Sequence, residues 1–146
     1  MSKPPVIAVV GATASGKTAL GAAIAGLYHG EVVSADSMQI YQGLDIATAK
    51  PDAEEMQGIP HHLISVLEPD VPFSVAEYVE LARSKVEEIH QRGKLPVIVG
   101  GTGLYVDSLL DNIQFPDIPA DDVLREQLNQ EAVRLGNAAM LERLRQ

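Results

Sequence analysis

The chain has 146 residues, of which 46% are hydrophobic and 21% are charged, a composition that predicts one globular domain and excludes a disordered protein. It contains no cysteine, which excludes disulfides, thiolate metal sites and cysteine nucleophiles, and its formal net charge of −9 argues against a free-standing nucleic-acid-binding module. Without an apolar run of about 20 residues or a signal peptide, we expect a cytoplasmic protein with no membrane span.

The first predicted strand, 6–10, leads into the loop Gly11-Ala12-Thr13-Ala14-Ser15-Gly16-Lys17-Thr18. The spacing G-x-x-x-x-G-K-[ST], between a β-branched strand and a helix expected over 18–28, is typical of a phosphate-binding loop. Its glycines permit a turn whose backbone N–H groups surround a phosphate, and the helix N-terminus adds partial positive charge. We predict that residues 11–18 bind phosphates, with Lys17 at the terminal phosphate and Thr18 as a ligand of Mg²⁺.

A second strand is expected over 31–36, and it ends in the carboxylate of Asp36. Open α/β sheets bind ligands at the carboxyl ends of their strands, which makes Asp36 a candidate general base. The same residue type before Ser37 and Met38 is also typical of a helix N-cap, and both roles hold if only one carboxylate oxygen caps. Lys50, further along in a loop, is expected to be an exposed lysine rather than a phosphate ligand.

A third strand is expected over 61–67, beginning with two adjacent histidines. Neighbouring residues of a strand face opposite sides, which is poor geometry for two ligands of one metal ion. The pattern therefore favours structural, hydrogen-bonded roles for His61 and His62.

A capping box over 74–77 predicts a helix that continues to residue 90, where the following glycine stops it. The fourth strand, 95–99, leads into a second glycine-rich turn over 100–105 and a helix through residue 110. This turn places the Thr102 hydroxyl at a carboxyl edge of the sheet, like Asp36.

Alternating strands and helices predict an α/β fold: a P-loop NTPase-like, mostly parallel sheet with helices on both faces. The proline-containing stretch that follows has no periodicity, and beyond it an amphipathic helix over 122–135 is expected to end at Gly136, with a further helix behind it. The expected organisation is a P-loop core (1–111), a linker (112–119) and a helical segment (120–146).

The order of five motifs closely resembles that of the tRNA dimethylallyltransferases, the isopentenyl transferases of tRNA. The motifs are the loop 11–18, Asp36-Ser37-Met38-Gln39-Ile40-Tyr41, Thr48-Ala49-Lys50-Pro51, Pro60-His61-His62-Leu63-Ile64 and Gly100-Gly101-Thr102-Gly103-Leu104-Tyr105. The likeness covers essentially the whole chain, but only about the amino-terminal half of a family member. It implies that 1–111 form an incomplete catalytic core and that 120–146 begin a helical tRNA-binding insertion.

The resemblance implies transfer of a dimethylallyl group from dimethylallyl diphosphate to N6 of the adenine 3′-adjacent to the anticodon in tRNA, with release of pyrophosphate. It implies a monomer in which Asp36 accepts the N6 proton, Thr102 lies beside the diphosphate and the amine, and Lys17 acts on the leaving group with Mg²⁺. The tRNA-binding residues that it implies are Asp36, Ser37, Met38, Gln39, Thr102 and Arg125.

Two other functions remain open. In a P-loop small-molecule kinase, ATP would occupy the loop and Asp36 would accept a proton from a substrate hydroxyl, but the chain has no arginine before Arg83 to meet a transferred phosphoryl group. In a truncated, non-catalytic form, the chain would bind pyrophosphate or nucleotide without turnover. Transfer of a labelled dimethylallyl group, compared with transfer of the γ-phosphate of ATP, separates these functions.

Overall fold

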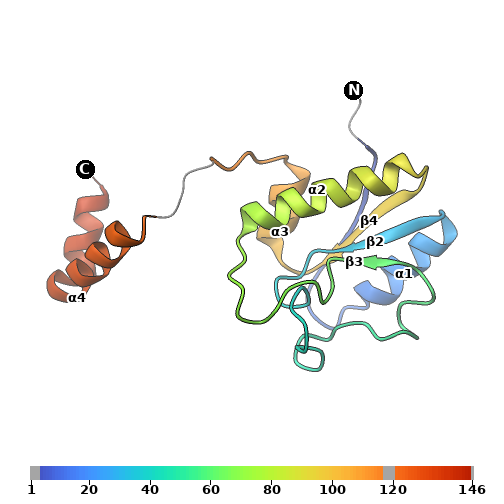
Figure 1. Cartoon of the computed structure of the whole chain (residues 1–146), viewed down its shortest axis with the longest axis horizontal. Coiled ribbons are helices and arrows are strands. Elements are labelled where there is room, and N and C mark those ends of the chain that lie inside the picture. Colours follow the sequence, from blue (N-terminus) through green and yellow to red (C-terminus); the bar gives the residue numbers. More distant parts are fainter. Residues whose placement is uncertain (1–3, 117–120, 146) are drawn as a thin grey trace. The chain divides into compact units, whose positions relative to one another are not determined.

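The structure is a computed structural model that describes residues 4–116 and 121–145. The chain divides into two compact units, Met1–Gln114 and Phe115–Gln146. The first unit contains a sheet with helices, and the second is helical (Figure 1). Residues 117–120 of the predicted linker lie outside the described part of the chain, and the predicted domain bounds stay a prediction.

Four parallel strands form the sheet of the first unit, in the order β1-β4-β2-β3 (Figure 1). They are β1 (Ile7–Val10), β2 (Gly30–Ser34), β3 (His61–His62) and β4 (Leu95–Gly100). Because β1 and β2 both pair in parallel with β4, the loops that follow these three strands leave the same edge of the sheet. The predicted parallel α/β fold is confirmed.

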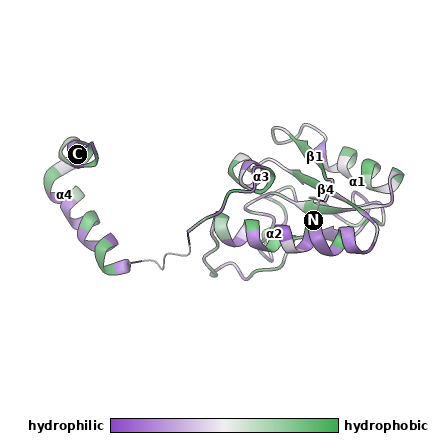
Figure 2. Ribbon diagram, turned by 90° about the horizontal axis from the view of Figure 1, so that it is seen from above, coloured by the Kyte–Doolittle hydropathy of each residue, from purple (hydrophilic) through white to green (hydrophobic). Residues whose placement is uncertain are grey.

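Helices cover both faces of the sheet: α1 (Lys17–Leu27), α2 (Val75–Gln91) and α3 (Gly103–Leu110). Successive strand residues alternate between the faces, so Val32 packs in the cluster under α1, whereas Val33 packs in the cluster under α2 and α3. The strands β1 and β4 consist largely of hydrophobic residues, whereas α2 carries both hydrophobic and hydrophilic residues (Figure 2). Buried Gly21 lets α1 approach β4 closely, since a Cβ there would lie 2.4 Å from Val99 Cγ2.

The third strand is much shorter than the sequence predicts. It ends at His62, because Leu63 and Ser65 have φ angles of 60° and 52°, in the left-handed region that interrupts a strand. The Ser65 N–H instead donates to the Gln39 carbonyl, at 2.9 Å. The prediction of a strand over 61–67 is therefore wrong beyond its first two residues, and the segment supports the turn after β2 instead.

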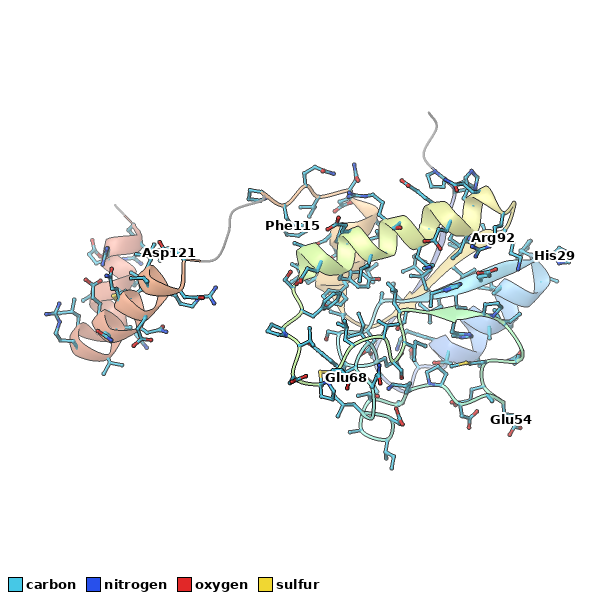
Figure 3. All side chains as sticks on the ribbon, in the orientation of Figure 1. His29, Glu54, Glu68, Arg92, Phe115 and Asp121 are labelled. Carbon is cyan, nitrogen blue, oxygen red and sulfur yellow. The ribbon has the colours of Figure 1, made fainter. Side chains whose placement is uncertain are left out.

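Both histidines have the structural roles that the sequence predicts. His61 Nδ1 lies 2.8 Å from the Ile59 carbonyl oxygen, and burial lowers the pKa of His61. His62 Nε2 lies 2.6 Å from Oε2 of Glu31, a β2 residue whose side chain is only 4% exposed. Arg92 also binds this carboxylate, from the end of α2 (Figure 3).

The start of α2 confirms the predicted capping box. Ser74 Oγ accepts a hydrogen bond from the Glu77 N–H, and Glu77 Oε2 accepts one from the Ser74 N–H at 2.7 Å. Two N–H groups that the helix itself leaves unpaired are thereby satisfied. The chain turns away after α2 at Gly93, whose φ of 72° is left-handed.

The second unit consists of α4 (Asp122–Leu144), whose first turn Asp121 caps. Gly136, at φ 80° and ψ 166°, divides α4 into two helices, which confirms the predicted break. None of the described residues of α4 is buried, and large apolar side chains such as Val133 remain exposed. Among the described residues, no helix combines the length and apolar character needed to cross a membrane.

Candidate functional site

The predicted phosphate-binding loop connects β1 to α1, and its second glycine, Gly16, has a special conformation. Gly16 is the N-cap of α1 and has a φ of 83° and a ψ of 13°, which side-chain-bearing residues rarely adopt. No atom lies within 4 Å of a Cβ built on Gly16, so its conformation rather than crowding favours glycine there. Lys17 is therefore the first residue of α1, and its Nζ donates to the Ala12 carbonyl at 2.5 Å.

The loop lies against the second glycine-rich turn, which follows β4. A Cβ built on Gly101 would lie 3.2 Å from the Gly11 carbonyl oxygen and 3.9 Å from Lys17 Nζ. The Lys17 ammonium therefore lies beside both glycine-rich segments, although they are about 90 residues apart in the sequence. A side chain at Gly101 would compete with that ammonium for space.

Asp36 follows β2 and uses one carboxylate oxygen as a cap. Its Oδ1 accepts hydrogen bonds from the Met38 N–H at 2.9 Å and the Gln39 N–H at 3.2 Å. Its Oδ2 accepts no hydrogen bond from the residues that the structure describes. The capping role is confirmed, and it leaves an oxygen available for a second role.

Thr102 fastens the turn after β4 to the turn after β2. It occupies the N-cap position of α3 without capping that helix; its Oγ1 accepts a hydrogen bond from the Ser37 N–H at 3.0 Å instead. Its own N–H donates to the Ala35 carbonyl at 3.2 Å. The two turns lie so close together that residue 100 has no room for a side chain, since a Cβ on Gly100 would lie 2.2 Å from the Ala35 carbonyl oxygen.

These loops enclose a cavity of about 530 Å³ at the carboxyl edge of the sheet. Its lining includes residues 13–18 of the predicted phosphate-binding loop, Asp36, Met38, Gln39, the segment 47–49, Glu55 and residues 99–101. Thr102 and Ser37 are not in the lining, and they are hydrogen-bonded to each other. The cavity thus brings together the predicted phosphate loop and the predicted base.

The sequence prediction overlooked the part of the lining formed by 47–49. The Gln39 side chain holds this segment, because its Nε2 donates to the Thr48 carbonyl at 3.2 Å and to the Ala49 carbonyl at 3.1 Å. The motif 48–51 was the signal that pointed to this segment. The contact between Gln39 and an adenine stays a prediction.

Lys50 and Arg125 also lie outside the cavity lining. Lys50 was expected to be exposed, and this is wrong: its side chain is 7% exposed because its ammonium is hydrogen-bonded inside the unit. Arg125 belongs to the separate second unit, where its side chain is exposed and its Nη1 lies 3.8 Å from Asp122 Oδ1. Its role in tRNA binding stays a prediction.

The residues around the cavity suit an ion that binds mainly to phosphate. Among residues 4–116 and 121–145, no group of three or more histidine, aspartate or glutamate side chains could hold a metal ion. Mg²⁺ at phosphates needs only one or two protein ligands, since phosphate oxygens and water complete its octahedron. Thr18, the predicted Mg²⁺ ligand, is in the cavity lining, and its role as a ligand stays a prediction.

Comparison with a family model decides the family. The model described as IPP transferase matches residues 39–146. The chain belongs to the IPP transferase family. Among its curated relatives, the tRNA dimethylallyltransferase of an Exiguobacterium species is 49% identical over 99% of this chain and 46% of its own length. That of Bacillus pumilus is 55% identical over 87% of this chain and 40% of its own length.

Solved structures of this family share the fold. A tRNA isopentenylpyrophosphate transferase from Bacillus halodurans matches with a TM-score of 0.77 and 46% identity, over 97% of this chain and 47% of that chain. A eukaryotic dimethylallyltransferase acting on tRNA matches with a TM-score of 0.73 and 31% identity, over 87% of this chain and 32% of that chain. The chain spans about half the length of the curated IPP transferase relatives it matches.

Proposed function

We propose that this chain carries the catalytic centre of a tRNA dimethylallyltransferase. The reaction transfers the dimethylallyl group of dimethylallyl diphosphate to N6 of the adenine 3′-adjacent to the anticodon and releases pyrophosphate. One observation carries the proposal: the phosphate-binding loop and a carboxylate with an available oxygen, that of Asp36, line the same cavity. A relative with 31% identity is described as acting on tRNA, which supports this acceptor.

The loop 11–18 binds the leaving group. Breaking the bond between C1 of the dimethylallyl group and the diphosphate oxygen leaves the electron pair on pyrophosphate, whose negative charge therefore grows. Backbone N–H groups at the start of α1 face that charge, and Lys17 exchanges its bond to the Ala12 carbonyl for one to the diphosphate. Thr18 would hold a Mg²⁺ ion, and such an ion neutralises part of the diphosphate charge.

Asp36 acts on the nucleophile. The N6 amine of adenine is a weak nucleophile, because its lone pair is delocalised into the ring, and it must lose a proton as the new C–N bond forms. Oδ2 of Asp36 accepts that proton while Oδ1 stays bonded to the Met38 and Gln39 N–H groups. Thr102 keeps this turn in place through Ser37, and the adenine reaches the cavity only after leaving its base stack.

The test compares Asp36→Asn and Lys17→Met with the unaltered chain. Labelled dimethylallyl diphosphate, Mg²⁺ and tRNA are incubated together, and label in tRNA and released pyrophosphate are counted. Asp36→Asn keeps an oxygen for the cap, so we expect diphosphate affinity, measured by calorimetry, to change by less than about twofold while transfer falls at least about 100-fold. We expect Lys17→Met to weaken diphosphate binding by about tenfold or more, since it removes a charged hydrogen bond.

Three results would overturn the proposal. Transfer of the γ-phosphate of ATP without dimethylallyl transfer would support a kinase. Binding of diphosphate without transfer would support the non-catalytic form. Full transfer activity in Asp36→Asn would show that another group takes the proton.

A further inference from the structure

The ammonium of Lys50 is buried and fully hydrogen-bonded. Its Nζ donates to the Tyr41 carbonyl at 2.7 Å, to Asp45 Oδ1 at 2.7 Å and to Ser65 Oγ at 2.8 Å. An ammonium has three N–H donors, and each has a partner. Because burying an unpaired charge is costly, the Asp45 carboxylate makes the 7% exposure of the Lys50 side chain tolerable.

The three partners of Lys50 belong to three different segments. Tyr41 ends the turn that begins at Asp36, Ser65 follows β3, and Asp45 lies in the loop 43–50. The first two segments already support each other, because the Ser65 N–H donates to the Gln39 carbonyl at 2.9 Å. Lys50 therefore fastens the loop 43–50 to a support that is bonded to the sheet.

Polar contacts hold this loop. Ile46, near its tip, is 98% exposed, so that side chain does not anchor the loop to the core. The other side-chain hydrogen bonds of the loop run from Gln39 to the carbonyls of Thr48 and Ala49, and from the Thr48 hydroxyl to the carbonyls of Leu44 and Asp45. Removing Lys50 would take away the anchor that joins the loop to two neighbouring segments at once.

We propose that Lys50 is a positioning residue that holds the segment 47–49 in place as one wall of the reaction cavity. This inference rests on the proposed function. The segment lines the cavity together with Met38 and Gln39, whereas the hydrogen-bond partners of the Lys50 ammonium all lie outside the phosphate-binding loop. Lys50 thus affects how the acceptor is held and leaves diphosphate binding unchanged.

Hydrogen exchange tests the structural half of the proposal without catalysis. We compare Lys50→Met with Lys85→Met, a control that also removes a paired lysine, since Lys85 Nζ lies 2.6 Å from Glu88 Oε2 on α2. In Lys50→Met, amides 45–50 should exchange about tenfold faster, while amides of β4 keep their rates. In the control, Lys85→Met, the exchange rates of both sets of amides should stay unchanged. Unchanged exchange over 45–50 in Lys50→Met would overturn the proposal, and so would faster exchange throughout the sheet.

Calorimetry and steady-state transfer test the functional half. Pyrophosphate with Mg²⁺ should bind Lys50→Met and the unaltered chain with affinities that differ by less than about twofold. In Lys50→Met the KM for tRNA should rise about tenfold, whereas the KM for dimethylallyl diphosphate should stay unchanged. Asp45→Asn keeps an acceptor for Lys50 and should show a smaller rise. Equal losses for both substrates would overturn the proposal. If the unaltered chain transfers nothing, the proposed function fails, and hydrogen exchange still decides whether Lys50 holds the wall.

Discussion

Replacing Glu31 with glutamine removes a buried negative charge that three partly exposed side chains bind. The Glu31 side chain is 4% exposed, and its oxygens lie 2.6 Å from His62 Nε2, 2.6 Å from Arg92 Nη2 and 2.8 Å from Lys94 Nζ. These partners come from β3 and from the connection between α2 and β4, so one carboxylate joins three parts of the first unit. Glutamine keeps the size of the side chain, but it carries no charge to balance the Arg92 guanidinium and the Lys94 ammonium.

The pKa of Glu31 sets how much its charge contributes to folding stability and over which pH range this contribution disappears. Burial raises this pKa, but hydrogen bonds from Lys94 and His62 and the charges of Arg92 and Lys94 outweigh burial and lower it to about 2, from an ordinary 4.5. The difference corresponds to about 3 kcal/mol of folding free energy. Because the folded value lies below the unfolded one, this contribution is fully present above pH 4.5 and disappears as the pH falls toward 2.

Urea unfolding of the unaltered chain and Glu31→Gln at several pH values between 7 and 2 measures this contribution. At pH 7 we expect Glu31→Gln to be less stable by about 3 kcal/mol, and the gap should close toward pH 2. Glu88→Gln is the control, since it breaks a 2.6 Å pair with Lys85 that is exposed to solvent, and it should change stability little. A gap for Glu31→Gln that stays constant with pH, or that Glu88→Gln matches, would refute the reasoning.

Three further substitutions test individual contacts by urea unfolding at pH 7. Ser74→Ala removes the cap of α2 and should cost about 1 kcal/mol; no loss would mean that the capping box adds nothing. Tyr78→Phe should also cost about 1 kcal/mol, because its hydroxyl donates to a buried β2 carbonyl at 3.1 Å; an equal stability would contradict that role. Gly100→Ala should cost about 2 kcal/mol or more, because the Cβ would lie 2.2 Å from the Ala35 carbonyl oxygen. Its control, Gly103→Ala, meets no atom within 4 Å, and equal losses in the two would argue against crowding.

Local patterns predicted the features that neighbouring residues determine. Three such features are the turn of the predicted phosphate-binding loop, the capping box at Ser74 and the break at Gly136. Each depends on residues a few positions apart, so the spacing of residue types in the sequence predicts its geometry. The same holds for Asp36, whose capping of the N–H groups two and three residues later follows from its position before a turn.

Predictions failed where distant segments compete for a residue. The stretch after His62 has the composition of a strand, but its backbone bonds to the turn after β2 and takes left-handed angles at Leu63 and Ser65. Lys50 looked like an ordinary surface lysine, because nothing nearby in the sequence shows that Ser65 will lie 2.8 Å from its ammonium. Such contacts depend on the paths of several segments, which periodicity does not describe.

The sequence by itself determined the parallel α/β core, the phosphate loop and the carboxylate that follows the second strand, since repeated spacing and residue type encode local geometry. Only the tertiary structure decided that Asp36 lines the cavity, that Thr102 bonds to the turn after β2, and that the Lys50 ammonium joins three segments. The physical reason is that hydrogen bonds are short and directional. Whether residues 15 or 65 positions apart form one depends on the whole packed arrangement of strands and helices.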